Sequence, residues 1–333
     1  MKAPSQRNRK MAEPSTEDPR NQPVEAIGVN IAERIYAGLV VAHKVQGELL
    51  SYPPGPVPQD SDEDDALVEL PAESLVDGIC ELAVKLAQGR ESSVRKSSIK
   101  GVGVALPGLV RSGVVEEAPN LPQLKGARIQ DMLASGIEAR GLKAPVTIVN
   151  DADAVAAGLA SQYGKLEQQV RVWTIGTGIG YGCYPFMEGV WEGGHTVVTL
   201  DDKENYCGCG GRGHLEGIMG HRAMRLRFLD MEPEEVFEAA NSRSDSRCVE
   251  FKQLWHKALA AATATTIHQA GARKFFITGY NVRFLDLNML KDYLHQMVKM
   301  SPLQNYSVEI VQDNQMTRVI GAAVAAEQAV DRC

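Results

Sequence analysis

Apolar positions near the start of the chain follow first the pattern of strands and then that of a helix. Apolar runs over residues 26–31 and 35–42, with a third short run after Gly47, predict three strands. Farther on, apolar residues recur at helical spacing after a Ser/Glu start and before Gly89, namely Leu75, Ile79, Leu82, Ala83 and Leu86. This part of the chain is therefore predicted to form an α/β unit.

The remaining chain continues the alternation of strand and helix. The stretch "IKGVGVALPGLV" predicts a buried strand, and "VTIVNDADAVAAGLASQYG" a strand that becomes a helix at Asn150–Asp153. Two strands around a glycine turn are expected in "VRVWTIGTGIGYGCYPFMEGVW", and one helix in "LEGIMGHRAMRLRFLD". A long helix from "CVEF", a strand at "KFFITGY" and a closing helix at "TRVIGAAVAAEQAV" follow. The pattern predicts two α/β halves with a cleft between them.

Length and charge narrow the classes of protein that fit. At 333 residues the chain exceeds what one small core usually serves, so two domains are expected. No apolar run approaches the ~20 residues of a membrane span, so no membrane contact is expected. The net charge of −7, without a clustered excess of Lys and Arg, argues against a nucleic-acid partner.

Two segments and the cysteines carry further information. Residues 1–24 are polar and proline-dotted, which predicts a disordered tail, and they lack the apolar core of a secretion signal. Residues 54–66 are proline-rich and then acidic, so they are expected to form an exposed loop. The six cysteines are irregularly spaced, which favours a reducing cytoplasm over a disulfide framework.

The densest chemistry lies in "NYCGCGGRGHLEG", residues 205–217. Cys207, Cys209 and His214 place two thiols and an imidazole on one short loop, and His195 upstream is a candidate fourth ligand. Thiolate and imidazole sets usually bind zinc, and a closed set of four is structural and does not activate water. The alternative is that these are ordinary reduced thiols and surface histidines.

A carboxylate follows the buried strand in "IVNDADA". Asp151 would stand at a strand end that opens a helix, the edge at which ligands lie in open α/β sheets. There it could accept a proton from a substrate hydroxyl. The alternative is that the Asn150–Asp151 pair only caps the helix, a position that favours both residue types.

The glycines of "IGTGIGYG", residues 175–182, leave backbone N–H groups bare between two strands. Such a concavity suits a phosphate. A plain glycine-rich hairpin is the alternative, since the stretch lacks the lysine of a Walker loop and does not lead from a strand into a helix.

Two glutamates flank the cysteine loop and its histidines. If His195 binds zinc, Glu192 is held three residues away, and Glu216 is tied to the same loop just after His214. Two carboxylates fixed in this way would form a rigid surface for hydroxyl groups, such as those of a polyol. The alternative is a pair of surface glutamates.

Taken in order, Asn150-Asp151, "GTGIGYG", "EGGH" and "CGCGGRGHLE" resemble the ROK family of sugar kinases and sugar-responsive repressors. The segments "GVALPGLV", "EEAPNLP" and "IGAAVAA" also resemble family segments, so the likeness covers residues ~26 to ~330. The resemblance implies an α/β fold of the actin-like ATPase (ribonuclease H-like) class, with two domains that close on a sugar and a nucleotide.

The resemblance also implies a role for each matching residue. Asp151 matches the catalytic base that accepts the proton of the attacking sugar hydroxyl. Gly176, Thr177 and Gly178 match the second phosphate loop, and Gly279 belongs to the adenosine-side motif. The matches to sugar contacts are Asn120, Asn150, Glu192, His195 and Glu216, and the matches to zinc ligands are His195, Cys207, Cys209 and His214. His214 replaces a family cysteine.

The chain departs from the family on the nucleotide side. Residues Asn30–Arg34 stand where the family has D-x-G-G-T-[KN], so an amide replaces the magnesium-side aspartate and both glycines are gone. Glu33 places a negative charge where phosphates should lie, which costs roughly 1–4 kcal/mol per charge pair at ~4 Å. The G-G-G motif reads Gly279-Tyr280-Asn281. The sugar half of the motif set is thus kept and the nucleotide half is altered.

Two functions follow from this resemblance. The first is an ATP- and magnesium-dependent kinase of hexoses or N-acetylhexosamines, with structural zinc and a degenerate first phosphate loop. The alternative is a non-catalytic sugar-binding homologue, a sensor or interaction protein. A repressor is a distant third, because no DNA-binding segment precedes residue 25. The resemblance implies a homodimer or homotetramer.

The expected domain organisation combines these observations. The four expected parts are a tail at 1–24, an N-terminal domain at 25–149, a C-terminal domain at 150–316 and a closing helix at 317–333. The acidic loop 54–66 belongs to the first domain and the zinc loop 195–216 to the second. The closing helix is expected to pack back on the first domain.

Overall fold

The computed structural model describes residues 24–55, 67–89, 99–164, 166, 168–187, 189 and 191–331. The expected disordered tail, up to residue 23, and most of the expected acidic loop, residues 56–66, lie outside the described residues. Within the described part, no helix has both the length and the apolar character needed to cross a membrane.

The first half of the chain forms a five-stranded mixed sheet in the order β3-β2-β1-β4-β7. Strands β1, β2 and β3 pair antiparallel, whereas β4 and β7 run parallel to β1. The strands are β1 (Glu25–Ile31), β2 (Ile35–Val41), β3 (Lys44–Tyr52), β4 (Val102–Leu106) and β7 (Val146–Asn150). β1 and β4 are buried along their whole length, as expected of central strands covered on both faces.

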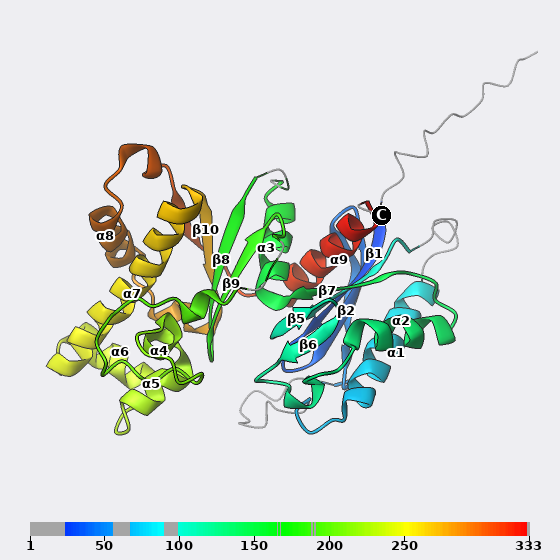
Figure 1. Ribbon diagram of the computed structural model, residues 1–333, viewed down its shortest axis with the longest axis horizontal. Coiled ribbons are helices and arrows are strands. Elements are labelled where there is room, and N and C mark those ends of the chain that lie inside the picture. Colours follow the sequence, from blue (N-terminus) through cyan, green and yellow to red (C-terminus); the bar gives the residue numbers. More distant parts are fainter. Residues whose placement is uncertain are drawn as a thin grey trace, which may run out of the picture.

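Helices α1 (Ala72–Gln88) and α2 (Ile129–Ala139) lie side by side against this sheet (Figure 1). Their apolar faces enter the same buried cluster as the strands, with Leu75, Ile79 and Leu133 almost fully covered. A short hairpin of β5 (Leu109–Arg111) and β6 (Val114–Glu117) lies between β4 and α2 in sequence. The helix predicted around Leu75–Leu86 is confirmed as α1.

The second half forms a four-stranded sheet in the order β11-β10-β8-β9. Its strands are β8 (Val170–Ile175), β9 (Ile179–Tyr184), β10 (Lys274–Thr278) and β11 (Ser307–Ile310). Strands β8 and β9 form an antiparallel hairpin, and β10 and β11 run parallel to β8. The helices of this half are α4 (Leu215–Met219), α5 (His221–Arg227), α6 (Pro233–Ser242), α7 (Ser246–Ala270) and α8 (Leu287–Met297).

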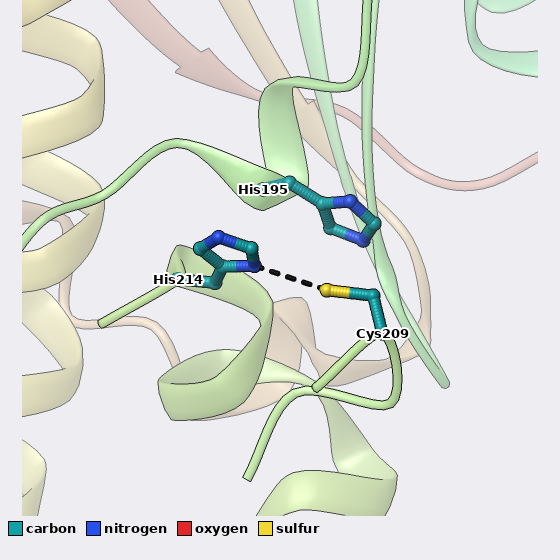
Figure 2. Close-up of side chains that lie close together, drawn as sticks. All are labelled: His195, Cys209 and His214. Carbon is teal, nitrogen blue, oxygen red and sulfur yellow. Dashed lines mark hydrogen bonds between the residues drawn. The ribbon is translucent and has the colours of Figure 1, made fainter. Parts of the chain in front are cut away.

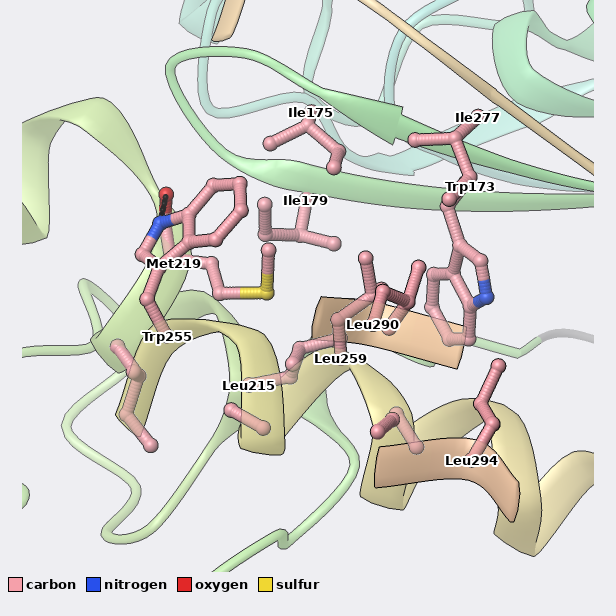
Figure 3. Close-up of a cluster of buried hydrophobic side chains, with 14 of the residues drawn as sticks. Trp173, Ile175, Ile179, Leu215, Met219, Trp255, Leu259, Ile277, Leu290 and Leu294 are labelled. Atoms are coloured by element: carbon pink, nitrogen blue, oxygen red, sulfur yellow. Dashed lines mark hydrogen bonds between the residues drawn. The ribbon is translucent and has the colours of Figure 1, made fainter. Parts of the chain in front are cut away.

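The core of the second half lies between its sheet and helices α7 and α8 (Figure 3). Trp173 from β8 and Trp255 from α7 are its largest fully buried side chains. Each indole N–H has a partner, since Trp173 donates to Thr263 Oγ1 at 3.1 Å and Trp255 donates to the Met219 carbonyl at 3.4 Å. Burying one large apolar side chain contributes about 1.5–3 kcal/mol to the stability of the fold, so this cluster stabilises the elements that carry the neighbouring loops.

Helices α3 (Asp151–Gln162) and α9 (Gln315–Asp331) lie between the two sheets (Figure 1). The backbones of the two helices approach closely at Gly158, where a Cβ would lie only 2.0 Å from the Thr317 carbonyl oxygen. α9 packs equally closely on β1, where a Cβ at Gly28 would lie 1.9 Å from the carbonyl oxygen of Val319. The two helices therefore connect the sheets, and the beginning of α9 packs along the second half of α3.

The structure corrects one predicted helix and one predicted strand. The single helix expected after the cysteine loop is two short helices, because Gly220 leaves the helical conformation at φ −62° and ψ 142°. The third strand, β3, begins at Lys44, before Gly47, and continues past this glycine. Its pairing with β2 shifts register between Ala37 and Leu39, opposite the segment that contains Gly47. Both differences arise from backbone geometry at a glycine.

Candidate functional site

Asp151 is the first residue of α3 and directly follows β7. Its neighbour Asn150 caps the helix, since Asn150 Oδ1 accepts hydrogen bonds from the N–H groups of Ala152 at 2.9 Å and Asp153 at 3.4 Å. The Asn150 Nδ2 group donates to the Gly108 carbonyl at 3.2 Å. Both polar atoms of the Asn150 amide thus have partners, and these join the end of β7 to the start of α3.

The Asp151 carboxyl has one nearby cation in the described part of the chain. Arg318 Nη1 of α9 lies 3.9 Å from Asp151 Oδ2, and the Asp151 side chain keeps 29% of its surface exposed. Burial raises the pKa of Asp151 above its usual value, and the Arg318 guanidinium opposes that rise. The carboxyl group is therefore placed and partly desolvated, as a proton acceptor needs to be.

Glu192 shares an electrostatic environment with several other predicted sugar contacts. Burial raises the pKa of its carboxyl, the His195 imidazole lowers it, and the carboxylates of Asp151 and Glu216 raise it further. His195 Nε2 lies 3.8 Å from Glu216 Oε1. The structure thus brings Asp151, Glu192, His195 and Glu216 into one neighbourhood.

Asn120 lies in an exposed turn after β6. In the described residues no hydrogen bond links its side chain to the other predicted sugar contacts. Its turn is close to them through Gly108, because a Cβ there would lie 2.3 Å from the carbonyl oxygen of Glu117. Gly108 in turn accepts the hydrogen bond from Asn150.

The four predicted zinc ligands lie within one small region, and Figure 2 shows three of them, His195, Cys209 and His214. Cys209 Sγ is 3.3 Å from His214 Nδ1 and 3.4 Å from Cys207 Sγ. One ligand atom each from His195, Cys209 and His214 lies within 4.8 Å of the other two, and the same holds for His195, Cys207 and Glu216. Two thiols and two imidazoles are a donor set that suits tetrahedral zinc, and His195, Cys209 and His214 already lie close enough together to fit one ion.

Backbone pairing brings His195 and His214 together. Val198 N donates to the Gly213 carbonyl at 2.8 Å, and Leu215 N donates to the Thr196 carbonyl at 2.9 Å. The two imidazole rings lie almost parallel, with centroids 5.2 Å apart. A short two-stranded contact outside the sheets thus brings His195 and His214 together.

An ion pair anchors the beginning of the cysteine loop. Arg227 of α5 forms two hydrogen bonds with the Glu204 carboxylate, one of them from Nη1 to Oε1 at 3.0 Å, and both side chains are at most 15% exposed. The same guanidinium lies 4.4 Å above the ring of Tyr206. This bidentate geometry fixes the loop just before Cys207.

The predicted second phosphate loop, Gly176–Gly178, turns between β8 and β9. The Gly176 carbonyl accepts from His221 N and from Asn281 Nδ2, each at 3.1 Å. A hydrogen bond links the Tyr280 side chain to Thr177, while burial raises the pKa of the Tyr280 phenol. Residues on α5 and after β10 thus hold the loop in place from outside.

Gly279 lies beneath this loop with φ 101°. A Cβ there would lie 2.4 Å from the Ile175 carbonyl oxygen, so only glycine fits without a shift of the backbone. Tyr280, which follows it, is 47% exposed and has its ring 5.4 Å from that of His221. The altered adenosine-side motif therefore places an aromatic ring over the loop.

The altered first phosphate segment is a tight turn between β1 and β2. Asn30 is fully buried, and its Nδ2 donates to Gln315 Oε1 of α9 at 2.7 Å, whereas its Oδ1 has no partner among the described residues. Arg34 donates to the Pro53 carbonyl, and Glu33 is exposed. The turn is thus joined to the beginning of α9.

Sequence reasoning missed the charged pair at the beginning of α9. Arg318 Nη2 binds both oxygens of Asp313, at 2.9 and 3.1 Å, in addition to facing Asp151. The signal was present, because a basic residue in the first turn of a helix opposes the helix dipole and therefore needs another reason to be there.

Two mixed sheets joined through α3 and α9 give the chain an α/β fold of the actin-like type. A model of the ROK family matches residues 61–329. The chain belongs to the ROK family, which confirms the resemblance in the sequence.

Several solved structures share this fold. The ROK hexokinase of Thermus thermophilus superposes with a TM-score of 0.70 at 19% identity, over 93% of this chain and 100% of that one. The ROK glucokinase of Streptomyces griseus, solved with glucose and AMPPNP, gives a TM-score of 0.62 at 21% identity over 91% and 99%. A ROK transcriptional regulator, a homologue of the Escherichia coli MLC protein, gives a TM-score of 0.67 at 17% identity, over 92% of this chain and 78% of that one.

Curated relatives include both kinases and a repressor. The glucokinase of Pyrobaculum calidifontis is 30% identical over 183 residues, which is 50% of this chain and 57% of that protein. The N-acetylmannosamine kinase of Haemophilus influenzae is 28% identical over 224 residues, 64% of this chain and 71% of the kinase. A putative xylose repressor of a Caldicellulosiruptor species is 34% identical over 160 residues, 44% of this chain and 36% of the repressor. The match thus spans little more than half of the glucokinase.

Proposed function

We propose that this protein is an ATP-dependent sugar kinase that phosphorylates a hexose or an N-acetylhexosamine. The observation that carries the proposal is the gathering of Glu192, His195 and Glu216 in the neighbourhood of the Asp151 carboxyl at the beginning of α3. A sugar needs several fixed hydrogen-bonding groups beside one proton acceptor, and this set supplies both.

In the proposed reaction, the carboxylate of Asp151 takes the proton of one sugar hydroxyl. The resulting oxygen forms a bond to the terminal phosphorus of ATP while the bond from that phosphorus to the ADP oxygen breaks. The backbone of Gly176, Thr177 and Gly178 would face the phosphates, with Gly279 on the adenosine side and magnesium on the nucleotide. The sugar hydroxyls would be held by Asn120, Asn150, Glu192, His195 and Glu216.

We further propose that His195, Cys207, Cys209 and His214 hold a structural zinc ion. A closed set of four protein ligands supplies rigidity and no activated water. Such an ion would fix His195 and, through the loop, Glu216 for contact with the sugar. The described cysteines are all free, which suits the reducing cytoplasm that we propose as the location.

Specific contacts favour the non-catalytic alternative, a sugar sensor or interaction protein. Asn30 is tied to Gln315 at the turn where the family binds phosphates, and exposed Glu33 adds a negative charge beside it. The Tyr280 side chain is hydrogen-bonded to Thr177 of the second phosphate loop. A nucleotide would have to displace these contacts, whereas a sugar alone would not.

A panel of sugars with ATP and coupled ADP detection tests the two functions. The kinase proposal expects turnover with at least one hexose or N-acetylhexosamine, reduced by about 10²-fold or more in Asp151→Asn. Asp131→Asn on α2, an exposed aspartate, serves as the matched control. Sugar binding measured by calorimetry without turnover in the wild type would instead support the sensor.

We also propose that the chain assembles as a homodimer or homotetramer. Val197 and Leu200, in the segment that leads from His195 to the cysteine loop, are 54% and 94% exposed, and a partner subunit would cover them in the assembly that we propose. Light scattering on the purified protein measures the mass of the assembly, and a monomeric mass would contradict the proposal.

A further inference from the structure

Arg318 lies between two aspartates at the N-terminal end of α9. Its guanidinium binds Asp313 through Nη2 at 2.9 and 3.1 Å and through Nε at 3.3 Å. Its Nη1 lies 3.9 Å from Oδ2 of Asp151. The Arg318 side chain is only 12% exposed, so it is an ordered part of the site and not a solvated surface group.

The backbone around Arg318 is fixed relative to Asp151. The carbonyl oxygen of the preceding residue, Thr317, packs against Gly158 of α3. The Thr317 hydroxyl Oγ1 accepts a hydrogen bond from Gln162 Nε2 at 3.1 Å. A shift of α9 along α3 would break these contacts. Because Asp151 is the first residue of α3, the same contacts keep Arg318 and Asp151 at a fixed separation. Asp313 then fixes the orientation of the guanidinium, because a fork-shaped donor bound by two oxygens has little freedom to rotate.

The charges that face Asp151 are otherwise negative. Asp313, in the segment before α9, raises the pKa of Asp151. The charge of Asp151 in turn raises the pKa of Asp153, on its own helix, and of Glu192, just before the short helix at Gly193–His195. Like charges in a partly desolvated site favour the protonated carboxylic acid, which could not accept a proton from a hydroxyl. In the described residues, Arg318 is the cation that opposes them at Asp151.

We propose that Arg318, held by Asp313, is a positioning residue that keeps Asp151 ionised as the proton acceptor. This inference rests on the proposed sugar kinase function for the role of Asp151. Burial raises the pKa of Asp151 and Arg318 lowers it, which agrees in direction with the geometry. The guanidinium remains paired with Asp313, so Arg318 acts through Asp151 and not by binding the substrate.

A titration of the Asp151 carboxyl tests the inference without any ligand. Aspartate labelled with ¹³C at the carboxyl is followed by NMR from pH 3 to 9 in the wild type and in Arg318→Gln, with Asp151→Asn to assign the signal. We expect the pKa of Asp151 to be higher by about 1–3 in Arg318→Gln and to be largely restored in Arg318→Lys. Arg128→Gln, at an exposed pair on α2, should leave it unchanged. An unchanged Asp151 pKa in Arg318→Gln overturns the inference.

Kinetics separate this inference from the proposed function. For an active wild type, the acidic limb of kcat/KM should move to higher pH in Arg318→Gln, and below the limb kcat/KM should fall about tenfold for each pH unit that the limb moves. An Arg318→Gln variant that binds sugar more tightly or turns over faster would show that Arg318 blocks the base, and would also overturn the inference. A wild type that is inactive with every sugar, but whose Asp151 pKa depends on Arg318, contradicts only the kinase proposal.

Discussion

Oε2 of Glu216 accepts a hydrogen bond from the backbone N–H of Ile179 at 3.0 Å. Its other oxygen, Oε1, lies 3.8 Å from His195 Nε2 and 3.7 Å from Cys207 Sγ. One carboxylate from the beginning of α4 therefore contacts the glycine turn between β8 and β9, a candidate sugar contact and a candidate zinc ligand. The three predicted sites of the second half meet at Glu216.

The contact at Ile179 predicts different results for two substitutions of Glu216. Glu216→Ala leaves a partly buried N–H unpaired, which costs about 1–3 kcal/mol, whereas Glu216→Gln keeps an acceptor. We expect a lower Tm in Glu216→Ala than in Glu216→Gln, and sugar binding weakened about tenfold or more in both because the charge is lost. Calorimetry and thermal melting measure these effects, with exposed Glu238→Ala as control. Equal Tm values for the two variants would show that the bond to Ile179 contributes nothing.

The clustered thiols and imidazoles predict metal content. Elemental analysis of the purified chain should find about one zinc per chain. His214→Ala removes an imidazole that lies 3.3 Å from Cys209 Sγ, so we expect its zinc content to fall well below that of the wild type. His268→Ala, at an exposed position on α7, should keep the wild-type content. A well-folded wild type purified without metal would contradict the zinc proposal.

Asp153 predicts a pH-dependent stability. It is 9% exposed and accepts a hydrogen bond from Cys183 N at 2.7 Å, and burial raises its pKa to about 7. The folded chain thus holds this proton more tightly than the unfolded chain, whose pKa is near 3.8. The contribution of Asp153 to stability is fully present below about pH 4 and is lost as the pH rises to about 7.

Asp153→Asn keeps an acceptor for Cys183 N and removes the titration. We expect the Tm of the variant relative to the wild type to increase between pH 4 and pH 8, by about 2–4 °C or more at the upper end. Exposed Asp292→Asn on α8 is the control and should follow the wild type. A difference that does not depend on pH would mean that Asp153 is ionised throughout this range.

Gly158 predicts a large effect of a single methyl group. A Cβ there would lie 2.0 Å from the Thr317 carbonyl oxygen, and neither backbone can move far because each helix also packs on a sheet. We expect Gly158→Ala to destabilise by about 1–3 kcal/mol in urea unfolding, although alanine is the better helix former. Gly89→Ala, at the exposed end of α1, is the control and should be near neutral. A neutral Gly158→Ala would show that α3 and α9 separate easily.

Much of the fold could be predicted from sequence because the buried elements carry strong periodic patterns. α1, α3, α7 and β10 fall where apolar spacing places them. The hairpin of β5 and β6 was not predicted, because strands of three and four residues are too short to show a period. α8 was also missed, since only Leu290 and Leu294 of its eleven residues are buried.

The candidate site was predictable only where a motif concentrates the chemistry. Cys207, Cys209 and His214 lie within eight residues, so their proximity follows from the chain itself. Arg318 and Asp151 are far apart in sequence, and they meet only because α9 returns to pack beside α3. The capping role of Asn150 could be foreseen from residue preference, whereas its hydrogen bond to Gly108 depends on the parallel pairing of β4 and β7.

The ion pair between Glu204 and Arg227 bears on how the cysteine loop would acquire its metal. The loop is held at its beginning by two hydrogen bonds to α5 and at its end by the backbone contacts around His214, and neither hold involves a metal ion. If this loop binds zinc as we propose, these two contacts would order its two ends independently of the ion, and the contribution of zinc to folding would fall mainly on the segment between them.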